Sequence, residues 1–115
     1  MSLHEYSIVA ALLERVEELA RERRARAVHG VLVSIGELSG VEPDLLATAY
    51  ATFRERTVCE GAKLTILPVA ARWDCPECRR GIPRGAILAC SRCGVPARLC
   101  AGDEIVLERI EMEVA

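Results

Sequence analysis

Aromatic residues, histidines and long apolar runs are scarce in this sequence. Aromatic side chains make up 3% of the 115 residues, too few for the stacking platforms that bind single-stranded nucleic acid. No apolar run approaches the roughly 18 residues of a membrane span, and the N-terminus shows neither the basic segment nor the apolar core of an export signal. The sequence has no Ser/His/Asp order and no phosphate-binding loop. We therefore do not expect an enzyme.

Cysteines, in contrast, are regularly spaced. Cys75 and Cys78 form one Cys-x-x-Cys pair, and Cys90 and Cys93 form a second pair after eleven intervening residues. Two such pairs are typical of a tetrahedral zinc site in which each pair lies on a tight turn and supplies two thiolates. Because four thiolates leave no open position, the predicted site is structural rather than catalytic.

Other uses of paired cysteines fit less well. A redox Cys-x-x-Cys normally occurs once, near a βαβ pattern, and iron–sulfur clusters use different spacings. Two disulfides are disfavoured because, without an export signal, the cysteines are expected to be reduced or metal-bound in a cytoplasm. A thiol oxidoreductase would need an exposed cysteine of low pKa. Gly94 follows the second pair, where such a turn commonly needs a positive φ, and Gly81 follows the first pair after two arginines.

The distribution of charge keeps one alternative function open. A net charge of −2 argues against a large nucleic-acid or membrane-binding surface. Residues 69–102, however, carry a net charge of +4 and the remainder of the chain −6. Zinc bound by four thiolates lowers the charge of the segment to about +2. A zinc-ribbon nucleic-acid-binding or regulatory protein is therefore the alternative to the function developed below.

Hydrophobic periodicity predicts two helices. The first covers residues 5–26, where one apolar stripe contains Ile8, Leu12, Val16 and Leu19. The second begins near Pro43, because proline is tolerated in the first turn of a helix. Its apolar face contains Leu45, Leu46, Ala49, Tyr50 and Phe53.

Alternating segments predict three strands, at residues 27–35, 63–69 and 104–114. A further short strand is expected within residues 82–88, limited in length by a proline and a glycine. In the third strand, one face is assigned Val106, Ile110, Met112 and Val114, and the other Ile105, Leu107 and Arg109.

The order of these elements predicts an α+β fold with two helices on a three-stranded sheet and an inserted zinc-ribbon domain that holds its ion with four cysteines. Residues 1–68 and 103–115 are expected to form the α/β domain and residues 69–102 the ribbon. The insert would then act as the loop between the second and third strands, which makes these two strands neighbours. With 51% apolar residues, the chain can bury a core.

Several segments together resemble one protein family. They read HEYSIV at residues 4–9, IGELSGVEP at 35–43, EGAKL at 60–64 and IEME at 110–113, and they flank the two cysteine pairs in the family order. Over nearly its whole length the chain is similar to the HypA/HybF family of nickel-insertion accessory proteins for nickel–iron hydrogenase maturation.

The resemblance implies a cytoplasmic metallochaperone. Such a protein binds Ni(II) transiently, works with the GTPase HypB and delivers the ion to the hydrogenase large subunit; some relatives also serve urease. Residues 1–68 and 103–115 would form the nickel-binding domain, and the ribbon would hold a structural Zn(II). No membrane is implied as a partner, and nucleic acid belongs to the alternative function.

The family binds nickel through an N-terminal Met-His-Glu, using the histidine ring and terminal backbone nitrogens. The matching residues are His4 and Glu5, so His4 is the expected nickel ligand and Glu5 a weaker one. Imidazole and backbone nitrogen suit nickel, whereas thiolates take zinc. Without the resemblance, His4 would be read as a solvated residue at a frayed terminus, and the helix dipole alone would explain Glu5.

Met1-Ser2-Leu3 stands where the family has a single methionine. Three explanations are open. In the first, these residues are a vector-derived remnant that impairs the site. In the second they are native, and the site is built from His4, interior amides and Glu5. In the third, Met1 is removed, and the Ser2 amine, two deprotonated amides and the His4 ring enclose Ni(II) in a square plane.

Four further residues carry weaker signals. Glu42 lies in the loop where relatives place an acidic residue, although it also favours a helix start. His29 is expected to be a surface or satisfied core histidine. Cys59 and Cys100 belong to neither pair and are expected to pack as small apolar groups.

Overall fold

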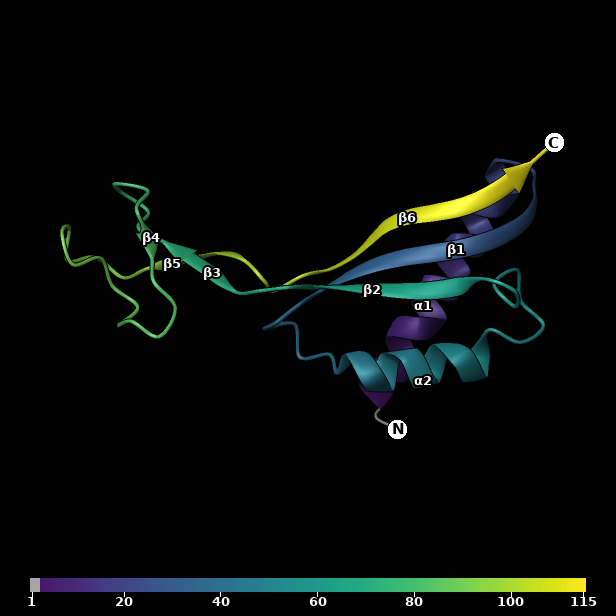
Figure 1. Cartoon of the computed structure of the whole chain (residues 1–115), viewed down its shortest axis with the longest axis horizontal. Coiled ribbons are helices and arrows are strands. Elements are labelled where there is room, and N and C mark those ends of the chain that lie inside the picture. Colours follow the sequence, from purple (N-terminus) through teal and green to yellow (C-terminus); the bar gives the residue numbers. More distant parts are fainter. Residues whose placement is uncertain (1–2) are drawn as a thin grey trace.

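The protein is elongated, with principal extents of 55 × 33 × 16 Å. The structure, a computed structural model, describes residues 3–115. Two helices and a three-stranded sheet form one part, and a small ribbon with its own sheet forms the other (Figure 1). The predicted α+β fold with an inserted ribbon is confirmed. No helix in residues 3–115 is long and apolar enough to cross a membrane.

Helix α1 (Leu3–Glu22) buries one apolar stripe against the sheet. It ends four residues before the predicted limit, because Arg24 adopts φ 53° and turns the chain into the following strand. The buried apolar side chains are Val9, Leu12, Leu13, Val16 and Ala20. The predicted stripe is thus rotated slightly, since Ile8 and Leu19 lie at its half-buried margin.

Helix α2 (Pro43–Phe53) packs on the same face of the sheet and against α1. Leu46, Ala49 and Tyr50 are buried, and the Tyr50 hydroxyl donates a hydrogen bond of 2.8 Å to the Ala62 carbonyl. This bond satisfies a polar group inside the core and ties α2 to the loop that leads into the next strand.

The main sheet has the order β2-β1-β6, with β1 (Ala25–Gly36) in the centre, β2 (Lys63–Val69) parallel to it and β6 (Ile105–Val114) antiparallel. The expectation that the second and third predicted strands are neighbours is therefore wrong. The longest strand takes the central position because it can then pair on both sides, and the α2 crossover brings β2 alongside it in parallel.

A β-bulge in β6 overturns the predicted faces of this strand. Leu32 pairs with Arg109 and Val33 with Leu107, so Glu108 is an extra residue without a partner in β1. The extra residue places Leu107 on the same side as Ile110, against the core. Glu108 instead accepts a hydrogen bond of 2.8 Å from the buried Ser34 hydroxyl. Leu107 therefore joins the core face in place of Val106, which is 36% exposed.

The ribbon contains a second, small antiparallel sheet of order β4-β3-β5. Its strands are β3 (Arg72–Asp74), β4 (Gly81–Ile82) and β5 (Arg98–Ala101). The strand expected within residues 82–88 is wrong in extent, because β4 ends at Ile82, directly before Pro83. Between β4 and β5, the only further pairing is an isolated bridge between Ala89 and Pro96.

Two glycines make the junction between the ribbon and the main sheet. A Cβ on Gly36 would lie 2.3 Å from the Gly102 carbonyl carbon, and one on Gly102 would lie 2.5 Å from the Ala71 Cα. Gly102 also has φ +100°, which disfavours any other residue. The Leu38 N–H donates to the Gly102 carbonyl at 2.6 Å. The connecting segments thus meet in direct backbone contact.

Candidate metal centres

The structure brings the four predicted cysteines together. The sulfur atoms of Cys75, Cys78, Cys90 and Cys93 all lie within 4.8 Å of one another, and Cys78 and Cys90 are separated by 3.8 Å between sulfurs. A tetrahedral ion about 2.3 Å from each of four sulfurs would hold them about 3.8 Å apart. The geometry of the donor set therefore fits a divalent ion of this kind.

The two cysteine turns have the same backbone design. In the first, the Cys78 N–H points to the Cys75 sulfur at 3.4 Å, and the Arg79 N–H donates to the Cys75 carbonyl at 2.8 Å. In the second, the N–H groups of Cys93 and Gly94 make the matching bonds to Cys90, at 3.3 and 2.8 Å. Each turn thus aims two thiols at one point and stabilises negative charge on the first sulfur.

The position after each pair takes a positive φ, as expected for Gly94, which has φ 73°. In the first turn the corresponding residue is Arg79, with φ 64°, and not Gly81. Each turn thus places its left-handed residue directly after the second cysteine, whether that residue is glycine or arginine.

The second cysteine turn favours an ionised thiol at Cys90. N–H groups of Cys93 and Arg92 lower the pKa of Cys90 to about 6, whereas the neighbouring Cys78 thiol and burial raise the pKa of Cys93. Four thiols this close cannot all lose their protons unless a cation compensates the charge. The residues present therefore suit a thiolate-bound metal ion.

The predicted nickel residues lie at the start of α1. His4 is exposed in the first turn, whereas Glu5 is only 3% exposed. The Glu42 N–H donates to Glu5 Oε2 at 3.4 Å, and Glu42 is the residue that precedes α2. The structure thus brings the starts of both helices together around the Glu5 carboxylate. Met1 and Ser2, on which the three explanations of the N-terminus depend, lie outside the described residues.

The other candidate residues are distributed through the fold. His29 lies on the surface with its Nε2 3.2 Å from a Glu113 carboxylate oxygen, as expected for a surface histidine. Cys59 is fully buried, which raises the pKa of its thiol and confirms it as a small core group. Cys100 is exposed, and its thiol donates to the Arg72 carbonyl at 3.2 Å. Burial was wrongly expected for Cys100, because its side chain projects from the outer side of a short strand.

Comparison with known proteins defines the class of the chain. A family model described as "Hydrogenase/urease nickel incorporation, metallochaperone, hypA" matches residues 3–112. The class is thus that of nickel-incorporation metallochaperones. The chain belongs to the HypA family.

Individual relatives match over nearly their full length. "Hydrogenase maturation factor HypA" of Aquifex aeolicus is 40% identical over 114 residues, with 97% of this chain and 99% of the relative covered. The protein of the same name from Wolinella succinogenes is also 40% identical, with 96% of each chain covered.

Solved structures show the same fold. The solution structure of the Ni metallochaperone HypA from Helicobacter pylori has a TM-score of 0.73 and 31% identity, with 96% of this chain and 98% of that chain covered. A second solution structure, of a HypA protein, has a TM-score of 0.80 and 32% identity over the whole of both chains.

Proposed function

We propose that this protein binds Ni(II) at the N-terminal end of α1 and delivers it during nickel–iron hydrogenase maturation. The observation that carries the proposal is the match of residues 3–112 to the nickel-incorporation family. The expected partners are a HypB-type GTPase and the hydrogenase large subunit, with urease maturation proteins as further clients. The expected compartment is the cytoplasm.

Two sites of different chemistry divide the work in this proposal. The four clustered cysteines hold Zn(II) and keep the ribbon, residues 69–102, in shape, because a site closed by four thiolates has no free position for exchange. Nickel binds instead at exposed His4, where few ligands permit release to a client. Residues 1–68 and 103–115 form the nickel-binding domain.

The contact between Glu5 and Glu42 supports the location of the nickel site. It fixes the first turn of α1 against the start of α2. Because His4 directly precedes Glu5, this contact also holds the backbone of His4 in a defined position. The nearly complete burial of Glu5 gives it a positioning role, with direct coordination as a weaker contribution.

Calorimetric titration with Ni(II), with zinc content followed in parallel, tests the proposal. We expect His4→Ala to lose nickel binding while keeping zinc, and His29→Ala, a matched change of a surface histidine, to keep both. Equal nickel binding by His4→Ala and wild type would exclude His4 as a ligand.

Whether the N-terminal amine is a ligand of the nickel site needs a separate measurement. The intact mass establishes whether Met1 is present, and a nickel titration after chemical blocking of the terminal amine tests amine ligation. Unchanged affinity after blocking would rule out the amine as a ligand.

The structure does not favour the nucleic-acid alternative. Two ribbon arginines form ion pairs with carboxylates. Arg98 Nη2 lies 3.1 Å from Asp74 Oδ1, and Arg84 binds Glu37. Both pairs reduce the positive charge that the ribbon can offer to phosphates.

A further inference from the structure

Strand β6 forms an exposed edge of the main sheet. In the part of the chain that the structure describes, it pairs with β1 alone. The opposite edge strand, β2, contains Pro68, a residue that discourages further pairing. β6 has no proline over its ten residues. Charged residues and the bulge at Glu108 also protect this edge, so it suits only a partner strand that pairs those charges and accommodates the bulge.

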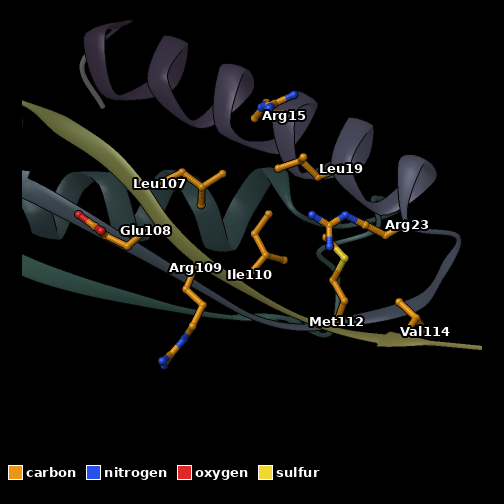
Figure 2. A pocket seen from close by; sticks show the side chains of 9 residues that line it. All are labelled: Arg15, Leu19, Arg23, Leu107, Glu108, Arg109, Ile110, Met112 and Val114. Carbon is orange, nitrogen blue, oxygen red and sulfur yellow. The ribbon is translucent and has the colours of Figure 1, made fainter.

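A groove runs beside this edge, between β6 and α1. Its floor carries Leu107, Ile110 and Met112, and Arg15 and Arg23 lie on the α1 side, around a cavity of 530 Å³. Figure 2 shows Leu107 and Ile110 directed toward α1, and Arg109 directed away from it. A second cavity of 280 Å³ shares Arg15 and Leu107 with the first. The apolar side of β6 is therefore only partly covered.

We propose that a second copy of this chain pairs its β6 antiparallel with this β6, about a two-fold axis at Ile110. The two sheets then form one continuous sheet of six strands, with all helices on one face. The proposal goes beyond nickel delivery and does not depend on it.

The pairing follows from the sequence of β6 and its bulge. With Glu108 left out, as it is opposite β1, Ile110 becomes the midpoint of the strand. Ile110 then faces Ile110 of the second copy, and Arg109 faces Glu111 of the second copy. The outer pairs are Leu107 with Met112, Val106 with Glu113 and Ile105 with Val114.

This register matches both faces of the strand. On the helix side, every pair joins two apolar residues, which extends the partly covered apolar floor across the interface. On the open side, the two-fold axis creates two Arg109–Glu111 pairs of opposite charge. Within one strand, Arg109 Nη2 already lies 3.5 Å from Glu111 Oε1. The four side chains of the two copies therefore form one group in which positive and negative charges alternate.

Neighbouring registers lose this complementarity. A slide of one residue puts apolar side chains opposite charged ones, because alternate residues point to opposite faces. A slide of two residues restores the faces but centres the axis on Arg109 or on Glu111. Two like charges then meet at the centre of the interface, which is unfavourable.

Charge exchange tests the register. Sedimentation equilibrium of the zinc-loaded full chain over a concentration series should show a dimer for wild type. We expect Arg109→Glu and Glu111→Arg each to raise the dimer dissociation constant by about tenfold or more, because each creates two like-charge pairs. The double variant should restore dimerisation. Lys63→Glu, on the opposite edge strand, is the matched control and should leave it unchanged.

Cross-linking provides a second measurement that depends less on charge. Residues that face each other across an antiparallel pair have Cα atoms about 4.5–5.5 Å apart, within disulfide range. Ile110→Cys in a Cys100→Ser background should therefore form a covalent dimer under mild oxidation, with the zinc content retained. Thr65→Cys, on β2, should not.

The result that overturns the proposal is defined for each experiment. The proposal is overturned if the wild type stays monomeric at all concentrations or if the Arg109→Glu variant is as dimeric as the wild type. It is also overturned if the double variant is folded but does not recover dimerisation. Cross-linking of Thr65→Cys but not Ile110→Cys would place the interface on β2. Circular dichroism of every variant serves as the folding control. This control is needed because Glu111 packs closely over Gly30, so its replacement could disturb the sheet.

Discussion

Glu37 and Arg84 join the main domain to the ribbon through a two-pronged ion pair. Arg84 Nη1 donates to Glu37 Oε1 at 2.9 Å, and Nη2 donates to Oε2. The Ala71 N–H adds a third hydrogen bond to Glu37, at 2.8 Å. Glu37 follows β1, and Arg84 lies between the two cysteine turns, so the pair fixes the orientation of the ribbon where the connecting segments leave the sheet.

This ion pair predicts a pH dependence. The hydrogen bonds from Arg84 and Ala71 lower the pKa of Glu37 from 4.5 to about 2. Because the folded pKa is the lower one, the contribution to stability is complete above about pH 4.5 and is lost as the pH falls through about 2. An NMR titration of the Glu37 carboxyl carbon measures the midpoint.

The variant Arg84→Gln should move this midpoint back toward the ordinary value, because it removes the largest cause of the shift. Arg80→Gln, another change of a ribbon arginine, should leave the midpoint in place. A wild-type midpoint near 4.5 would show that the contact is not kept in solution.

The first cysteine turn offers a stabilising substitution. Arg79 holds φ 64°, a conformation that costs an L-residue about 1–2 kcal/mol and that glycine adopts without this cost. Arg79→Gly should therefore raise the free energy of unfolding of the ribbon by about 1 kcal/mol. Chelator-induced zinc release, followed with a coloured zinc indicator, should become slower.

Arg80→Gly is the control for this prediction. The backbone there is not left-handed, so glycine brings only its greater freedom in the unfolded chain and should be neutral or destabilising. A faster zinc release from Arg79→Gly than from wild type would contradict the strain at this residue.

The glycine junction should be intolerant of even one methyl group. Gly102→Ala adds a Cβ 2.5 Å from the Ala71 Cα, in a backbone conformation that alanine avoids. We expect a loss of about 2 kcal/mol or more in the free energy of unfolding, measured by urea denaturation. Gly61→Ala, where a Cβ meets nothing within 4 Å, should cost far less.

Loss of one clustered cysteine should unfold only part of the molecule. In zinc-finger peptides the apparent binding energy of about 10–16 kcal/mol is also folding energy, so Cys75→Ser should lose zinc and disorder the ribbon. The hydrophobic core contains residues of α1, α2, the main sheet and the α2–β2 connection, and none from residues 70–102. NMR spectra should therefore keep the core resonances.

Cys100→Ser, outside the cluster, should keep both zinc and the ribbon. A Cys75→Ser protein with a normal zinc content and an ordered ribbon would contradict the assignment of the cluster.

The sequence predicted local features well where a residue type has one strong preference. Proline at the start of α2, the positive φ of Gly94 and the burial of Cys59 follow from the chemistry of single residues. The spacing of the cysteine pairs likewise predicted their meeting, because two turns of this kind can aim four thiols at one point.

Features that depend on two distant segments could not be predicted in this way. The bulge at Glu108 depends on its pairing with β1 and on the hydrogen bond from Ser34, and alternation within β6 gives no sign of it. The position of β1 between β2 and β6 similarly reflects competition among strands. At the proposed nickel site, the buried carboxylate of Glu5 accepts a hydrogen bond from a backbone N–H 37 residues away in the chain, which the local sequence does not reveal.

The contact between Gly36 and Gly102 limits how these sequences can vary. Gly36 ends a buried strand, where glycine is normally a poor choice. A Cβ on Gly36 would meet the backbone of Gly102, and a Cβ on Gly102 would meet the backbone of Ala71. Because backbone atoms fill both spaces, a change at one glycine cannot be compensated by a change at the other. A saturation library selected for folding should recover glycine alone at both positions, even though neither belongs to a metal site.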